Sequence, residues 1–156
     1  SMIHCEDHEE CILTAIEMAD RICSQKQLKF TDLRKEILRM IWEGHGPQKA
    51  YDLLNKLQQT NPSAKPATVY RALDFLIGNG FIHKVASLNA FVGCSHPLKH
   101  RECYFLICDD CKNISECCDP NITAAIQTTT IQNQFVAKNT TLEISGHCNE
   151  CLNRSE

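Results

Sequence analysis

Two Cys-x-x-Cys pairs are the feature that most limits how this chain can fold. Cys108 and Cys111 form the first pair, Cys148 and Cys151 form the second, and 36 residues separate them. Two such turns that face each other supply the four thiolates of a tetrahedral structural zinc site. A site of this kind contributes on the order of 10 kcal/mol of coupled folding energy. We therefore expect zinc to hold the C-terminus of the chain against a small domain.

Composition favours metal ligands over disulfides for these four thiols. The chain contains 11 cysteines, and no apolar run approaches the roughly 18 residues that a membrane span needs. The N-terminus has no signal-peptide core, so we expect a cytoplasmic protein, in whose reducing compartment thiols at ligand spacing bind metal. Core cysteines or disulfides remain the alternative. A zinc-dependent deaminase is set aside because no proline precedes the first Cys-x-x-Cys.

Positive charge is concentrated in one part of the chain. The formal net charge is -3, yet residues 21–84 hold eleven Lys/Arg against five Asp/Glu, a local charge of +6. Such a segment is expected where a protein contacts the phosphates of nucleic acid, although a solvated basic surface would have the same count.

Apolar spacing predicts an α+β fold. Helical periodicity in the first half gives way to alternating, strand-like runs. The expected elements are four helices and a hairpin, or wing, at about residues 10–24, 31–44, 49–59, 65–80, 81–85 and 90–93. After a domain boundary near residues 85–95, the expected elements are strands at 103–107 and 135–144 and a helix at about 121–130.

The helix at residues 65–80 carries the best candidates for contacts with DNA. Its apolar face leaves Thr68 and Arg71 on the opposite side and Tyr70 at the border. In a helix-turn-helix, the N-terminal end of the second helix enters the major groove. Arg71 is suited to reading guanine, a contact worth about 1–3 kcal/mol of discrimination. Packing at the helix edge is the alternative for Tyr70.

Four segments, at residues 50–54, 64–76, 80–85 and 105–111, resemble the ferric uptake regulator family of metal-dependent bacterial repressors, and within it the zinc-responsive members. The resemblance implies a winged helix-turn-helix DNA-binding domain over residues 1–85 and a hinge over residues 86–101. It implies an α+β dimerisation and metal-binding domain over residues 102–156. It also implies a homodimer that binds double-stranded operator DNA when zinc is bound.

The resemblance further implies a regulatory zinc site in the hinge region, in addition to the structural site, and therefore two zinc ions per chain. The ligands that match are His83, Cys94, His100 and Glu116. His100 lies one residue further from the first Cys-x-x-Cys than expected, so His96 is an alternative third ligand. The soft thiolate of Cys94 favours zinc over iron. By the same resemblance, Tyr51 and Tyr70 touch DNA, and Lys65 and Thr68 contact phosphates.

The remaining thiols have no assigned role. Cys103, Cys117 and Cys118 are expected to be packing or spare thiols, and any of them could join a third metal site. A further Cys/His cluster near the N-terminus could bind metal and comprises His4, Cys5, His8 and Cys11.

The function expected from this pattern is a zinc-dependent transcriptional repressor that controls zinc uptake genes. Two alternatives stay open. One is a redox- or peroxide-sensing repressor on the same scaffold, and the other is a zinc-stabilised interaction module without DNA binding. No nucleophile–base arrangement or Gly-rich phosphate loop points to an enzyme.

Overall fold

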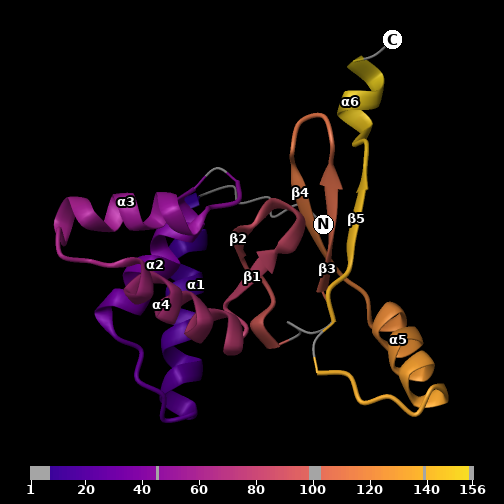
Figure 1. Ribbon diagram of the computed structural model, residues 1–156, viewed down its shortest axis with the longest axis horizontal. Helices are drawn as coiled ribbons and strands as arrows, with labels where there is room; N and C mark the ends of the chain where they lie inside the picture. The colour runs from indigo at the N-terminus through magenta and orange to yellow at the C-terminus, as the bar shows by residue number, and fades with distance from the viewer. Residues whose placement is uncertain (1–7, 45, 99–102, 139, 155–156) are drawn as a thin grey trace. The chain divides into compact units, whose positions relative to one another are not determined.

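Four helices and a β-hairpin build the chain up to Leu98, and a three-stranded sheet with two helices follows from Cys103 (Figure 1). The computed structural model describes residues 8–44, 46–98, 103–138 and 140–154. These residues form two compact units, and the break between them falls after Leu98, inside the predicted hinge. None of the described helices is both long and apolar enough to span a membrane.

The first unit contains the helix-turn-helix. Its elements are α1 (His8–Gln25), α2 (Asp32–Glu43), α3 (Ala50–Thr60), α4 (Pro66–Gly78), β1 (Ile82–Val85), the 3-10 turn η1 (Ala86–Leu88) and β2 (Ala90–Gly93). Thr31 caps α2, because its hydroxyl accepts a hydrogen bond from the Arg34 backbone N–H at 3.3 Å. Pro66 occupies the first turn of α4, where its missing N–H costs nothing.

One hydrophobic core joins these helices. Buried side chains recur at helical spacing on α2 and α4, and the stripe on α4 consists of Val69, Ala72, Leu73 and Leu76. This is the apolar face that the sequence predicted, so the opposite face of α4 is left to solvent. The four predicted helices are confirmed, and each end lies within two residues of its predicted position.

The wing is tied to the segment that precedes α3. Strands β1 and β2 pair antiparallel, with His83 opposite Val92. Asn89 takes a left-handed conformation (φ 48°) at the turn between them. Gln48 exchanges two backbone hydrogen bonds with Phe91, at 2.9 and 2.8 Å. The winged helix-turn-helix is therefore confirmed.

The second unit is a small sheet in the order β4-β3-β5. Its elements are β3 (Cys103–Cys108), β4 (Ile114–Cys118), α5 (Pro120–Gln132), β5 (Glu143–Gly146) and α6 (Asn149–Arg154). Strands β3 and β4 are antiparallel, whereas β3 and β5 are parallel. The predicted strand at β3 and the predicted helix at α5 are confirmed. The α+β fold class is confirmed with them.

The strand predicted at residues 135–144 is wrong over most of its length. Only Glu143 and Ile144 belong to β5, which continues to Gly146, and Phe135 and Val136 are exposed outside any strand. A β-patterned run becomes a strand only where it finds a ladder partner, and β3 pairs with Glu143–Gly146 alone on this edge. Strand β4 was not predicted, since Ile114–Cys118 has little apolar alternation.

Helix α5 runs through the β-branched segment at residues 128–131 and ends two residues beyond the predicted end. The threonine hydroxyls in this turn are satisfied locally, because Thr129 and Thr130 donate to the backbone carbonyls of Ala125 and Gln127 at 2.9 and 2.8 Å. The exposed hydroxyls therefore fit a helix that continues through Gln132.

Replacing Gly93 with alanine should destabilise the wing. A Cβ at Gly93 would overlap the indole ring of Trp42, which packs in the core. We expect Gly93→Ala to lower the free energy of unfolding by about 1–3 kcal/mol. Urea denaturation followed by circular dichroism measures this loss. Gly78→Ala is the control, since a Cβ there meets nothing within 4 Å; equal midpoints for the two variants would contradict the prediction.

Candidate metal centres and nucleic-acid interface

The two Cys-x-x-Cys pairs meet because β3 and β5 run parallel. Cys108 ends β3 and is the register partner of Gly146, at the end of β5. Two residues later the chain reaches Cys148, which leads into α6, and Cys151 lies in the first turn of that helix. Cys111 returns to the same place through the turn after β3, where Lys112 has φ 61°. The predicted juxtaposition of these four residues is present.

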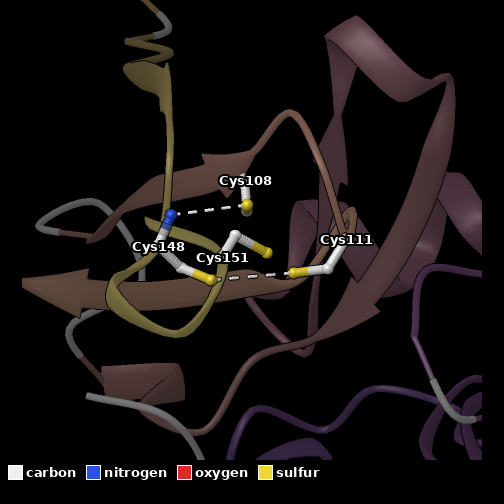
Figure 2. A group of neighbouring side chains, drawn as sticks. All are labelled: Cys108, Cys111, Cys148 and Cys151. Carbon is white, nitrogen blue, oxygen red and sulfur yellow. Dashed lines mark hydrogen bonds between the residues drawn. The ribbon is translucent and has the colours of Figure 1, made fainter. Parts of the chain in front are cut away.

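The cluster has the dimensions of a tetrahedral thiolate site. The sulfurs of Cys108, Cys111, Cys148 and Cys151 all lie within 4.8 Å of one another, and the Cys111 and Cys148 sulfurs are 3.8 Å apart. A zinc ion with Zn–S bonds of 2.3 Å would separate its sulfurs by about 3.8 Å. In Figure 2 the four side chains converge on one point from β3, from the turn that follows it, from the segment between β5 and α6, and from α6. The donor set therefore fits zinc in both chemistry and size.

Backbone N–H groups favour the thiolate form of Cys108. Hydrogen bonds from the backbones of Cys111 and Cys148 lower the pKa of Cys108 to about 6, and the Cys148 N–H lies 3.4 Å from its sulfur. The hydrogen bond with Cys148, together with desolvation, raises the pKa of Cys151 to about 12. The Asn113 backbone lowers the pKa of Cys111, but the Cys108 thiol and desolvation outweigh it, and the net shift is upward.

An ion pair that sequence reasoning missed links the two Cys-x-x-Cys turns. His147 precedes the second pair, Asp110 lies inside the first, and His147 Nδ1 is 2.7 Å from the Asp110 carboxylate. The hydrogen bond to Asp110 raises the pKa of His147. The sequence offered one signal for this pair: His147 directly precedes Cys148, and Asp110 directly precedes Cys111. The pair links the two turns beside the four thiols.

The predicted regulatory ligands are distributed over both units. His83 in β1 and Cys94 just after β2 are buried in the first unit, where the Cys94 N–H donates to the Phe81 carbonyl at 3.0 Å. Glu116 lies in β4 opposite Phe105 and is buried too. His96 is exposed. His100 lies outside the described residues, so this ligand set stays a prediction.

The predicted DNA contacts are on the surface of the helix-turn-helix. Tyr51 in α3 is 72% exposed, and Tyr70 in α4 is 53% exposed. Arg71 and Lys65 are exposed, and Thr68 is half-buried near the start of α4. The arrangement leaves two cationic side chains and two phenols available to a partner.

Two of the thiols without an assigned role form a bond. Cys103 and Cys118 are joined as a disulfide across β3 and β4, so they are not simply packing thiols. Cys117 projects from the opposite face of β4, opposite Tyr104. In the N-terminal cluster, His8 begins α1 and Cys11 is disulfide-bonded. His4 and Cys5 lie outside the described residues.

Zinc binding to the four-cysteine cluster should weaken as the pH falls. With raised pKa values, Cys111 and Cys151 are protonated near neutral pH in the metal-free protein, so zinc must displace at least two protons. We expect the affinity to fall about 100-fold per pH unit over this range. Chelator competition between pH about 6 and about 8 measures it. An affinity independent of pH would show that these thiols are not ligands.

Comparisons with known proteins agree with this architecture. The model of the Ferric uptake regulator family matches residues 25–145. The Zinc uptake regulation protein of Escherichia coli (strain K12) is 38% identical over 140 residues, which cover 88% of this chain and 81% of that protein.

Two solved structures match most of the chain. A zinc uptake regulator complexed with zinc and DNA matches with a TM-score of 0.85 and 34% identity, over 92% of this chain and 97% of the other. The crystal structure of holo XcZur matches with a TM-score of 0.81 and 38% identity, over 88% and 96% of the two chains. With its winged helix and its paired Cys-x-x-Cys turns, the chain belongs to the ferric uptake regulator family.

Proposed function

We propose that this protein is a cytoplasmic, zinc-responsive transcriptional repressor that binds operator DNA as a homodimer and controls zinc uptake genes. The observation that carries the proposal is that one chain of this family combines a cluster of four thiols suited to zinc with an exposed recognition helix. Relatives over most of its length include a zinc uptake regulator complexed with zinc and DNA, which supports both the metal and the partner.

The DNA contact is made by the exposed face of α4. Arg71 reads guanine in the major groove, and Tyr70, one residue before it, lies against the same duplex. Lys65 and Thr68 contact phosphates at the start of the helix, where the backbone N–H groups also favour an anion. Tyr51 extends the surface onto α3. The local charge of +6 supplies the attraction to the duplex that carries no sequence information.

Zinc acts through a second site with a different role. Its four ligands are His83, Cys94, either His100 or His96 as the third, and Glu116. When bound, zinc supplies a tetrahedral centre that joins side chains far apart in the sequence. DNA affinity then depends on zinc only if these contacts differ between the DNA-binding arrangement and the alternative, a coupling of typically about 1–3 kcal/mol. Each chain thus holds one structural and one regulatory zinc ion.

Replacing Arg71 with alanine should abolish the preference for operator over random duplex. We expect a loss of about 1–3 kcal/mol of discrimination, because the bidentate contact to guanine is removed while the helix stays folded. Fluorescence anisotropy with both duplexes at fixed salt measures the ratio. Arg21→Ala removes an exposed arginine on α1 as a control for charge alone. Equal ratios in wild type and Arg71→Ala would exclude Arg71 as a base contact.

Replacing Cys94 with serine should separate the two zinc sites. We expect Cys94→Ser and His83→Ala to keep one tightly held zinc per chain and to lose the zinc response of DNA binding. Metal analysis and DNA titrations across buffered free zinc measure the two properties. His96→Ala and His100→Ala, run in parallel, identify the third ligand as the one whose loss shifts the zinc midpoint. A Cys94→Ser protein with an unchanged midpoint would overturn the regulatory site.

A further inference from the structure

A second thiol pair lies at the opposite end of β3 from the zinc cluster. Cys103 begins β3, Cys118 ends β4, and the two residues face each other directly in the ladder with Cα atoms 4.1 Å apart. Their sulfurs are bonded to each other. Both residues are half-buried, so neither is enclosed in the core. None of the roles proposed above uses this pair.

The β-ladder keeps the pair together whether or not the bond is closed. Between Cys103 and the turn, β3 and β4 are paired residue by residue from Tyr104 opposite Cys117 to Ile107 opposite Ile114. The two sulfurs therefore need no movement of the strands to meet. A dithiol held in this way closes and opens as a local event, without unfolding of the sheet.

The pair touches a residue that matters for metal binding. Glu116 lies two residues before Cys118 and on the same face of β4, because side chains alternate along a strand. The Cys118 sulfur is 3.9 Å from a carboxylate oxygen of Glu116. A thiol at this place donates a hydrogen bond to the carboxylate, but a disulfide sulfur has no proton to donate. The redox state of Cys118 therefore decides whether Glu116 receives this contact.

We propose that Cys103 and Cys118 are an oxidation site for peroxides, and that closing their disulfide lowers the zinc affinity of the regulatory site through Glu116. The inference rests on the proposed function, in which Glu116 is a zinc ligand. One thiol loses its proton, and the thiolate attacks the peroxide, whose O–O bond breaks to give a sulfenic acid and hydroxide; hydroxide takes up the proton and leaves as water. The second thiol displaces the sulfenic oxygen as another water molecule and forms the disulfide. A dithiol reductant reverses the change.

The other cysteines do not substitute for this pair. The four thiols at the far end of β3 form the cluster proposed to bind structural zinc. As zinc ligands they would not be free to form a disulfide. Cys117 is adjacent in sequence but projects from the other face of β4, away from Glu116. Oxidation at Cys103 and Cys118 is therefore compatible with an intact structural zinc site.

The direction of the effect follows from the lost contact. Groups that hydrogen-bond a metal-ligating carboxylate orient it, and their removal typically costs 10–100-fold in metal affinity. A thiol is a weak donor, so the lower end applies, and we expect about a tenfold loss on oxidation. Oxidant would thus relieve repression at a free zinc concentration that keeps the reduced protein on DNA.

The test compares zinc affinity in the reduced and oxidised full-length protein. Wild type with its structural zinc is treated with hydrogen peroxide or with dithiothreitol, the disulfide is mapped by peptide mass spectrometry, and the regulatory zinc midpoint is measured in buffered zinc. Expected is a Cys103–Cys118 bond after peroxide, a midpoint about tenfold higher, and full recovery with dithiothreitol.

Three variants give the inference its controls. Cys103→Ser leaves the Cys118 thiol beside Glu116 and cannot form the bond, so it should keep the reduced midpoint in peroxide. Cys118→Ala lacks the donor, so it should show the raised midpoint in both conditions. Cys117→Ser alters the neighbouring thiol on the other face and should respond as wild type does.

Two results overturn the inference. One is a mapped Cys103–Cys118 disulfide with an unchanged zinc midpoint, and the other is the absence of this disulfide after peroxide while structural zinc is retained. Glu116→Gln, measured in dithiothreitol, separates the assignment of Glu116 as a zinc ligand from its coupling to the disulfide. If it leaves the midpoint unchanged, the ligand assignment in the proposed function fails, and the coupling fails with it. If it raises the midpoint while oxidation does not, only the redox inference is lost.

Discussion

The parallel pairing of β3 with β5 is the contact on which the metal chemistry of this chain depends. It brings the ends of two strands that are far apart in the sequence into register, Cys108 beside Gly146, and so delivers both Cys-x-x-Cys turns to one place. Backbone N–H groups at this place lower the pKa of the Cys108 thiol. The sheet positions the ligands, and the metal in turn anchors the short helix α6 to the sheet.

In the first unit, apolar packing positions the helix that carries the predicted DNA contacts. The stripe from Val69 to Leu76 holds α4 against α2 and α3, and this packing turns Tyr70 and Arg71 outward. The wing is held by backbone bonds between Gln48 and Phe91 and by the close approach of Gly93 to Trp42. Recognition and metal binding are thus supported by separate sources of stability, a core in one unit and coordination in the other.

Sequence reasoning succeeded where a local pattern decides the structure. The helices of the first unit have continuous apolar stripes, and the cysteine spacing predicted that the four cysteines lie together. It failed where partners far apart in the sequence decide, as at Phe135 and Val136, which have strand-forming side chains but no ladder partner. The bond between Cys103 and Cys118 was missed for the same reason, because their register depends on β4, a strand with no sequence signal.

The second unit has a small buried core. Of its described residues, only Phe105, Ile107, Cys108 and Glu116 are buried, and α5, β5 and α6 contribute none. So small a core offsets little of the conformational entropy of ordering the segment, and in the proposed function zinc at the four-cysteine cluster and a second subunit supply further stability. On that proposal, a newly synthesised chain completes this unit only when it acquires zinc. Zinc scarcity would then act on the protein twice, by emptying the proposed regulatory site and by limiting how many chains finish folding.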